Sequence, residues 1–421
     1  MQLYEHQIKA LENTKDKNRV AYFHDMGLGK TFTGSEKLNQ LGGRLNLVIC
    51  QKSKVDDWVE HFIENVHGFE VFDLTNKIDF SIYIRGGSRE AVRVVGVINY
   101  DLLIRRLELL SLRFDTIMLD ESSMIKNDTS QRTKTILRLG TKNVILLSGT
   151  PTGGKYEELY SQLKLLGWKI TKADYWKEYI KTYKINVGGF KLPIVTGYKN
   201  VGGLKRKMRE YGCDFLKTSE VFDLPAQTFQ EIKVEAPAEY KTFVKKELVE
   251  VDGSLLVGDT VLTKMLYARE LCGAYAPEKV KALADLIEST NDRLIIFYNF
   301  NIELDKIMQV CKQFKRPLSQ VNGHEKDLNA YENKDNSVTA IQYQSGAMGL
   351  NLQKANKIIY FTPPLSSELY EQSKKRIHRL KQERPCFYYQ LICTNSIEPK
   401  IYNTLAKRQD FTELLFKKGG F

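Results

Sequence analysis

Short, almost continuously apolar runs recur between helix-compatible stretches of this sequence. The first series lies at residues 20–23, 45–50, 92–100, 115–120 and 143–149, and the second lies at residues 293–299, 338–344, 357–363 and 386–393. Such runs are typical of parallel sheets, because helices cover both faces of these sheets and no strand needs a polar face. The sequence therefore predicts an α/β chain in which two parallel-sheet lobes follow each other.

The stretch between the two series has a different composition. Residues 153 to about 235 are rich in Lys, Tyr and Gly, which indicates loops and short helices. A chain of 421 residues is also longer than one ordinary core, since most domains stay below about 200 residues. We therefore expect a first lobe at 1–152, a helical, basic insertion and linker at 153–235, and a second lobe at 236–421.

Composition narrows the class of protein. The chain is 42% hydrophobic and 27% charged, as in globular proteins, and no apolar run reaches the roughly 18 residues of a membrane span. Residues 1–15 lack the apolar core of a signal peptide, so we expect a cytoplasmic location, or a nuclear one in a host with a nucleus, and no membrane partner. For a phage-encoded chain this means the host cytoplasm. The six cysteines form no CxxC pair, and we expect reduced, buried thiols.

The formal net charge is +12, from 63 basic and 51 acidic residues. An excess of this sign suits a polyanionic partner, and nucleic acid is the commonest one. Charge alone is weak evidence, because many basic proteins bind no polyanion specifically.

A glycine-rich motif, HDMGLGKT, follows the first apolar run directly. Its candidate phosphate-binding residues are Gly27, Leu28, Gly29, Lys30 and Thr31. The glycines allow backbone N–H groups to approach phosphate oxygens, the Lys30 ammonium can reach the β- and γ-phosphates, and the Thr31 hydroxyl suits Mg²⁺. The strict GxxxxGK[ST] pattern is not met, because His24 replaces its first glycine. The alternative is a glycine-rich turn that merely contains Lys-Thr.

Two further apolar runs end in polar residues. TIMLDESS places Asp120 and Glu121 at a strand end, where Asp120 can hold Mg²⁺ and Glu121 can orient and deprotonate water. LLSGTPT places the hydroxyls of Ser148 and Thr150 in a tight turn, where they can sense a γ-phosphate. Taken alone, the Asp-Glu pair is more often a solvated turn, and LLSGTPT is an ordinary one.

The order of LYEHQ, DMGLGKT, LDESS and SGTPT resembles the superfamily 2 helicases, and more narrowly the Swi/Snf-type DNA translocases. Residues 345–361 (SGAMGLNLQKANKIIYF), 371–385 (EQSKKRIHRLKQERP) and 391–401 (LICTNSIEPKI) resemble segments of the same family's second lobe. The resemblance covers residues 1 to about 410 and is weakest over 153–290. It implies two RecA-like lobes with ATP hydrolysed in the cleft between them.

The resemblance also implies roles for individual residues and makes ATP and Mg²⁺ the cofactors. In the first lobe, Tyr4 and Gln7 contact the adenine, Lys30 and Thr31 bind phosphate and metal, Asp120 and Glu121 act on metal and water, and Ser148 and Thr150 couple hydrolysis to movement. In the second lobe, Gly349 and Asn351 line the cleft, Arg376 and Arg379 act as arginine fingers, and Gln372 lies beside them.

The arginines have a physical rationale of their own. Phosphoryl transfer spreads negative charge over the γ-oxygens, and an inserted arginine contributes about 10³–10⁵ in rate. Arg376 and Arg379 are three residues apart, so we expect one helix to present both on one face. The alternative is that KKRIHRLKQER is a solvated basic helix or a phosphate-backbone contact.

The sequence departs from the family pattern at several positions. Gln51 stands where the family has proline, His24 and Asp25 replace an Asp-Glu pair, and Lys381 replaces a glycine. The arginine-rich segment between the lobes appears only as residues 215–225, without its paired arginines. None of these changes removes a group that hydrolysis requires.

No zinc-finger, helix-turn-helix or RRM signature is present, so we expect phosphate contacts with little base preference. The resemblance places backbone contacts at Lys52, Ser53, Gln344 and Ser345. The basic run at 204–209 (LKRKMR) is either a further contact surface or a solvated helix. Duplex DNA is the favoured partner, with a recruiting protein as a further one.

Three functions remain open at this point. The first is an ATPase that translocates on duplex DNA, to remodel bound protein, anneal strands or migrate forks and branches in replication or repair. The second is a strand-separating DNA or RNA helicase, which needs a wedge that the sequence does not clearly supply. The third belongs to another class and is a nucleotide-controlled regulatory switch.

Overall fold

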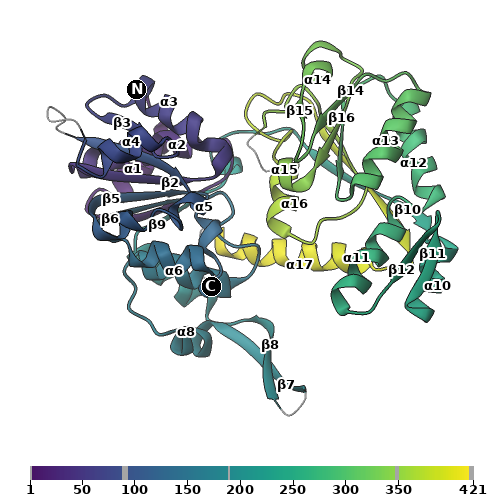
Figure 1. The fold of residues 1–421 in the computed structure, drawn as a ribbon, viewed down its shortest axis with the longest axis horizontal. Coiled ribbons are helices and arrows are strands. Elements are labelled where there is room, and N and C mark those ends of the chain that lie inside the picture. The colour runs from purple at the N-terminus through teal and green to yellow at the C-terminus, as the bar shows by residue number, and fades with distance from the viewer. Residues whose placement is uncertain (1, 88–92, 188–189, 347–349, 417–421) are drawn as a thin grey trace. The chain divides into compact units, whose positions relative to one another are not determined.

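The computed structural model describes residues 2–87, 93–187, 190–346 and 350–416 (Figure 1). The chain folds into two compact units. Unit 1 comprises residues 1–221 with 410–421, and unit 2 comprises residues 222–409. No helix among the described residues is both long and apolar enough to cross a membrane.

Unit 1 is built on a parallel sheet whose strand order, over the described residues, is β3-β4-β2-β5-β6-β1-β9. Its strands are β1 (Arg19–His24), β2 (Leu45–Cys50), β3 (Glu70–Asp73), β4 (Val94–Asn99), β5 (Arg113–Asp120), β6 (Gly140–Leu147) and β9 (Cys213–Leu216). Its helices are α1 (Glu5–Asn13), α2 (Lys30–Leu41), α3 (Val55–Asn65), α4 (Lys77–Tyr83), α5 (Tyr100–Leu103), α6 (Gln131–Arg138), α7 (Tyr160–Leu165), α8 (Lys172–Tyr179) and α9 (Val201–Glu210).

Alternate residues of the central strands enter two different hydrophobic cores. In β5, Ile117 and Leu119 belong to one buried cluster, whereas Met118 belongs to another, which also contains Trp58 and Phe62 of α3. Each face of the sheet is therefore covered and dry. This is why the strands read as continuous apolar runs in the sequence.

Unit 2 repeats this architecture with the strand order β10-β18-β17-β13-β16-β14-β15, in which only the β14–β15 pairing is antiparallel among the described pairs. The strands are β10 (Gln227–Glu235), β13 (Leu294–Tyr298), β14 (Leu318–Val321), β15 (Lys326–Asp327), β16 (Val338–Gln342), β17 (Lys357–Tyr360) and β18 (Cys386–Thr394). A separate hairpin consists of β11 (Leu248–Val251) and β12 (Ser254–Val257). The helices are α10 (Ala238–Lys246), α11 (Val261–Cys272), α12 (Pro277–Glu288), α13 (Asn301–Gln313), α14 (Asn329–Asn333), α15 (Tyr343–Gly346), α16 (Ser367–Lys374) and α17 (Glu398–Phe416), of which residues 398–409 belong to unit 2. Two parallel-sheet lobes are thus present, as the apolar runs predict.

The stretch 153–235 does not form a unit of its own. Strand β9 pairs with β1 in the sheet of unit 1, and β10 pairs with β18 in the sheet of unit 2. The stretch also contains an antiparallel hairpin, β7 (Ile180–Val187) and β8 (Phe190–Tyr198), where we expected loops and short helices. The alternation of polar and apolar residues at 182–186 is the signal for this hairpin, and a search for continuous apolar runs overlooks it.

The cysteines agree with the expectation of reduced thiols. All six are buried and free: Cys50, Cys213, Cys272, Cys311, Cys386 and Cys393.

A buried ion pair provides a test of the packing of unit 2. The Lys279 ammonium lies 2.6 and 2.7 Å from the two carboxylate oxygens of Glu398, and both side chains are at most 1% exposed. Lys279→Met should destabilise unit 2 by about 3–5 kcal/mol, because the carboxylate stays buried without its partner. Urea titrations in which hydrogen exchange of α12 peptides monitors the unfolding of unit 2 measure this loss of stability.

Tryptophan fluorescence serves as an internal control in the same titrations, because Trp58, Trp168 and Trp176 all lie in unit 1. The double variant Lys279→Met/Glu398→Gln should recover part of the stability, because it removes the charge from the carboxyl group. An equal loss in the single and double variants would contradict the role of the ion pair.

Candidate active site

Three sequence motifs meet at one edge of the sheet in unit 1. Strands β5, β6 and β1 are neighbours in this order and run parallel, so their carboxyl ends lie together. The segments that follow these ends are residues 25–31, 121–123 and 148–152. Ligands of open parallel sheets bind at this edge, and the chemistry of the three segments is therefore concentrated there.

The glycine-rich loop has the backbone that its glycines permit. Gly27 and Gly29 have φ angles of 85° and 68°, and α2 begins directly afterwards at Lys30. A Cβ atom at Gly29 would lie 2.3 Å from Nε2 of Gln7, so a larger residue could not fit there. The Lys30 ammonium donates to the carbonyl oxygens of His24 at 3.0 Å and Asp25 at 3.2 Å. It is thereby held over the loop at the start of a helix, where phosphates bind.

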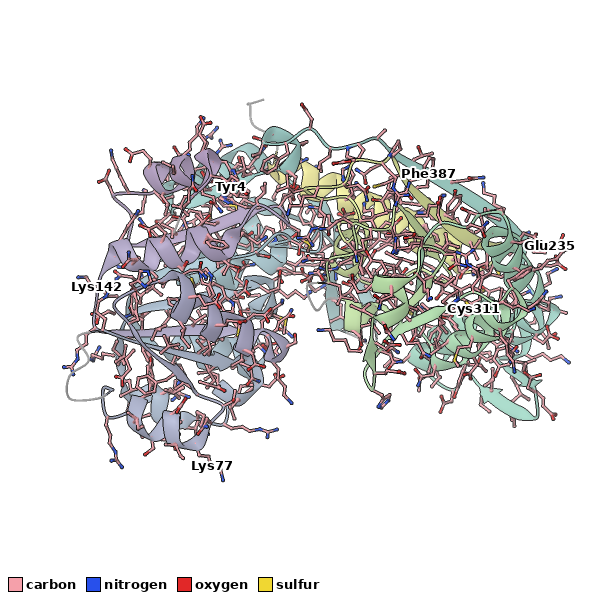
Figure 2. All side chains as sticks on the ribbon, turned by 90° about the horizontal axis from the view of Figure 1, so that it is seen from above. Tyr4, Lys77, Lys142, Glu235, Cys311 and Phe387 are labelled. Atoms are coloured by element: carbon pink, nitrogen blue, oxygen red, sulfur yellow. The ribbon has the colours of Figure 1, made fainter. Side chains whose placement is uncertain are left out.

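The Gln7 side chain holds the backbone of the glycine-rich loop by hydrogen bonds. Its Nε2 donates to the carbonyls of Gly29 at 3.0 Å and Leu28 at 3.4 Å, while its Oε1 accepts from the Tyr4 N–H at 2.8 Å. The Gln7 side chain is 1% exposed, whereas Tyr4, labelled in Figure 2, is 61% exposed. The structure thus places Gln7 as a brace of the phosphate loop and leaves the Tyr4 ring accessible to a base.

The acidic pair is oriented by residues that the sequence did not reveal. Oδ2 of Asp120 accepts from the indole N–H of Trp58 at 2.9 Å, and Oδ1 accepts from the Glu121 N–H at 3.0 Å. The Asp120 carbonyl accepts from the Tyr100 hydroxyl at 2.8 Å. Glu121 has φ 53°, a left-handed conformation that is strained for a residue with a Cβ. This turn carries the Glu121 carboxylate away from the direction of β5.

The Glu121 carboxylate is held by hydroxyl groups. Its Oε1 accepts from Oγ of Ser148 at 2.8 Å and from Oγ of Ser123 at 3.0 Å. Oγ of Ser148 in turn accepts from the Thr150 N–H at 3.1 Å. The Thr150 hydroxyl is buried and has no hydrogen-bond partner among the described residues. A donor is therefore available beside an oriented carboxylate, as a γ-phosphate sensor requires.

These residues fit a nucleotide with Mg²⁺. The left-handed glycines form a cradle for phosphate, and the orphaned Thr150 hydroxyl can donate to an anion. The two bonds that Asp120 accepts leave acceptor positions on its carboxylate for a metal-bound water. The Thr31 hydroxyl, in the first turn of α2, supplies the second oxygen donor.

The departures at positions 24 and 25 have partners of their own. His24 is fully buried, and its Nε2 lies 2.7 Å from Oδ2 of Asp214 in β9. Burial lowers the pKa of His24. Oδ2 of Asp25 accepts from the Thr218 N–H at 3.1 Å. The start of the phosphate loop is therefore attached to the segment that ends unit 1, which the spacing of motifs could not indicate.

The two candidate arginine fingers are not on a helix. Helix α16 ends at Lys374, and Arg376 and Arg379 lie in the turns that follow, so the helical presentation predicted from their spacing is wrong. The Arg376 carbonyl accepts from the Leu352 N–H at 3.2 Å, which takes the backbone out of helical bonding.

The same turns bring the arginines onto the segment at 350–355. Nη1 of Arg379 lies 3.5 Å from the Leu350 carbonyl, and burial lowers the pKa of Arg379. Arg376 is 5% exposed. The amide Nε2 of Gln382 donates to the carbonyls of Gln353 and Ala355 and so closes the turn.

The other site residues predicted in unit 2 differ in their exposure to solvent. Gln372 is buried, Asn351 is exposed, and Gly349 lies outside the described residues. Lys381, which replaces a family glycine, has φ 72°, the left-handed conformation that favours glycine.

The residues expected to touch nucleic acid follow strand ends in both units. Lys52 and Ser53 are exposed in the short 3₁₀ helix after β2. Gln344 is exposed and Ser345 is buried in α15, directly after β16. Their role as contacts remains a prediction.

Comparison with known proteins gives matches over most of the chain. A family model described as the SNF2-related domain matches residues 6–273, and one described as the helicase conserved C-terminal domain matches residues 278–381. DNA repair and recombination protein RAD26 of Saccharomyces cerevisiae is 25% identical over 348 residues, which cover 73% of this chain and 32% of that protein. The putative ATP-dependent helicase/translocase YwqA of Bacillus subtilis is 25% identical over 74% of this chain and 36% of its own length.

A longer alignment is found with the Drosophila melanogaster SWI/SNF-related matrix-associated actin-dependent regulator of chromatin subfamily A-like protein 1. It is 25% identical and covers 96% of this chain and 54% of that protein. The chain thus spans between about a third and about half of these curated relatives. A solved SWI2/SNF2 ATPase core of Sulfolobus solfataricus in complex with dsDNA aligns with 98% of this chain and 93% of its own, at 20% identity and a TM-score of 0.45. Because the SNF2-related model alone matches more than half of its residues, the chain belongs to the SNF2-related family of helicase-like ATP hydrolases.

Proposed function

We propose that this chain is an ATP-driven motor that hydrolyses ATP and translocates on duplex DNA. The observation that carries the proposal is the Glu121 carboxylate, which the Ser148 hydroxyl holds at 2.8 Å beside the loop of Lys30. A carboxylate fixed next to a phosphate-binding lysine can orient and deprotonate the water that attacks a γ-phosphate. A regulatory nucleotide switch needs the lysine and the loop but has no need for a general base oriented in this way.

In the proposed reaction the protein groups position charge and protons. The Lys30 ammonium exchanges the His24 and Asp25 carbonyls for phosphate oxygens. Glu121 accepts the proton of the attacking water, and the Thr150 hydroxyl donates to the γ-phosphate. Mg²⁺, when it is held through Thr31 and Asp120, neutralises part of the phosphate charge.

We further propose that Arg376 and Arg379 of unit 2 supply positive charge to the γ-phosphate during hydrolysis. The Arg376 side chain is 5% exposed, and the Arg379 guanidinium lies 3.5 Å from the Leu350 carbonyl, so burial and this contact already restrict the two side chains and reduce the conformational entropy lost on binding. An arginine that acts only in the transition state raises the rate of hydrolysis without being required for ATP binding.

DNA as the track rests on charge and on the relatives. The net charge of +12 suits a phosphate backbone, and one relative is named a DNA repair and recombination protein. We propose contacts to phosphates at Lys52, Ser53, Gln344 and Ser345, and recruitment by a partner protein.

The general base can be tested by removing its charge. Glu121→Gln keeps an oxygen that accepts from Ser148 but cannot take a proton, so phosphate release should fall by about 10²–10⁴-fold while ATP still binds. Binding of a fluorescent ATP analogue checks the second part, and Glu60→Gln, an exposed glutamate of α3, is the matched control. Turnover within fivefold of the unmodified protein would remove Glu121 from the mechanism.

The arginine assignment predicts a different pattern. Arg379→Ala should lower phosphate release by about 10³-fold and leave the affinity for the ATP analogue within threefold, because the guanidinium acts on the transition state. Arg384→Ala, which removes an arginine from the loop before β18, is the control. Unchanged turnover of Arg379→Ala would show that this side chain is not a finger.

The track is identified by the nucleic acid that stimulates hydrolysis. Phosphate release should rise most with blunt duplex DNA, less with single-stranded DNA and RNA, and should be slowest without nucleic acid. Displacement of a triplex-forming strand then reports translocation, and displacement of a strand from a tailed duplex reports strand separation. An ATPase that responds to no nucleic acid would exclude a motor and favour the regulatory switch.

A further inference from the structure

The β7–β8 hairpin and α9, up to the Glu210 that ends the helix, form a strongly basic segment. Residues 179–209 contain no Asp or Glu, and their basic residues are Lys181, Lys184, Lys191, Lys199, Lys205, Arg206, Lys207 and Arg209. A run of one sign on this scale contributes much of the net charge of +12 and creates a field that attracts polyanions.

The hairpin has two chemically different faces. Strand register pairs Tyr183 with Ile194 and Ile185 with Leu192, which places these four side chains on one face. It pairs Lys184 with Pro193 and Asn186 with Lys191, which places both lysines on the other face. One face is thus apolar and aromatic, and the opposite face is basic.

Both faces are open to solvent. Tyr183, Leu192 and Ile194 are 66%, 50% and 45% exposed, and Lys184 and Lys191 are exposed as well. Among the described residues, neither lysine forms an ion pair. An exposed apolar patch beside uncompensated positive charge marks a site of interaction rather than a feature of a solvated surface.

The root of the hairpin is fixed, although an isolated two-stranded hairpin is only marginally stable. Tyr198 stacks on Tyr156 with ring centroids 4.3 Å apart, and its hydroxyl donates to the Gly154 carbonyl at 3.2 Å. Ile180 is buried in the core of unit 1. The hairpin is therefore held at its base while its two faces project from the unit (Figure 1).

This root also adjoins the candidate active site. Gly154 is the second residue after the SGTPT motif, and its N–H donates to Oγ1 of Thr152 at 2.8 Å. The Tyr198 hydroxyl lies 3.0 Å from Oε2 of Glu157, in the short helix after the motif. A ligand held by the hairpin is thus attached to the segment that contains Ser148 and Thr150.

We propose that the β7–β8 hairpin binds DNA where a duplex opens, with unpaired bases against the Tyr183 face and phosphates of the other strand against Lys184 and Lys191. Intact duplex presents mainly phosphates and would use only the basic face. Unpaired bases offer apolar faces that stack on an aromatic ring. Where a duplex opens, one strand can present its bases to the aromatic face of the hairpin while the other strand presents its phosphates to the basic face. The inference deepens the proposed function by giving the DNA partner a second contact.

Binding without ATP tests the aromatic face. Fluorescence anisotropy with a forked duplex and a blunt duplex of equal length should show tighter binding of the fork. Tyr183→Ala should reduce this preference by about five- to tenfold, whereas Tyr183→Phe, which keeps the stacking ring, should retain it. A protein that binds both duplexes equally, or a Tyr183→Ala variant that keeps the preference, would overturn the proposal.

Salt dependence tests the basic face. Lys184→Ala/Lys191→Ala should weaken binding of both duplexes and reduce the slope of log K against log salt by about 1.8, from two lost phosphate contacts. Lys77→Ala/Lys142→Ala removes two exposed lysines elsewhere in unit 1 and should leave the slope unchanged (Figure 2). An unchanged slope in the hairpin variant would contradict the assignment.

Two further measurements distinguish DNA binding by the hairpin from an effect on ATP hydrolysis and from dimerisation of the chain. The Glu121→Gln protein should show the same fork preference as the unmodified chain, so a failure of hydrolysis does not affect the binding result. Sedimentation velocity should show the same mass for the unmodified and Tyr183→Ala proteins. A dimer that dissociates in Tyr183→Ala would assign the apolar face to a second copy of the chain and exclude DNA there.

Discussion

The hydrogen bond from Ser148 to Glu121 depends on the parallel sheet of unit 1, and it fixes the orientation of the carboxylate in the candidate active site. Strands β5 and β6 are paired up to Asp120 and Leu147, so the next residue of each strand emerges at the same level. The left-handed turn at Glu121 then brings its carboxylate within 2.8 Å of the Ser148 hydroxyl. A slip of one residue in the register would turn the side chains of a strand to the opposite face, and the bond would be lost.

Much of this arrangement can be predicted from local sequence. The continuous apolar runs exist because both faces of each sheet are buried, and polar residues appear only where the strands end. The motif that contains Lys30, the pair at Asp120 and the turn at Ser148 each follow such a run. Parallel topology alone then brings them to one edge, so the core of the site follows from the order of elements before any contact is known.

The supporting contacts could not be predicted in this way, because they join residues far apart in the chain. Trp58 and Asp120 are separated by 62 positions and His24 and Asp214 by 190. Nothing in the local pattern indicates either pair. The prediction that a helix presents Arg376 was wrong, because a three-residue interval suits a helix but does not indicate that the Arg376 carbonyl bonds to Leu352. The end of a helix is set by such competing bonds.

The turn after β6 makes contacts at both of its ends. At one end Ser148 bonds to the carboxylate of Glu121, and at the other Thr152 and Gly154 hold the root of the β7–β8 hairpin through Tyr198. A chain of hydrogen bonds from the candidate site to the hairpin transmits a conformational change only if one of the connected segments can adopt two arrangements. Among the described residues the buried Thr150 hydroxyl has no hydrogen-bond partner, so a γ-phosphate bound as we propose would add a bond at this turn. Under the proposed function, the turn that would bond the γ-phosphate is the same turn to which Tyr198 attaches the root of the hairpin.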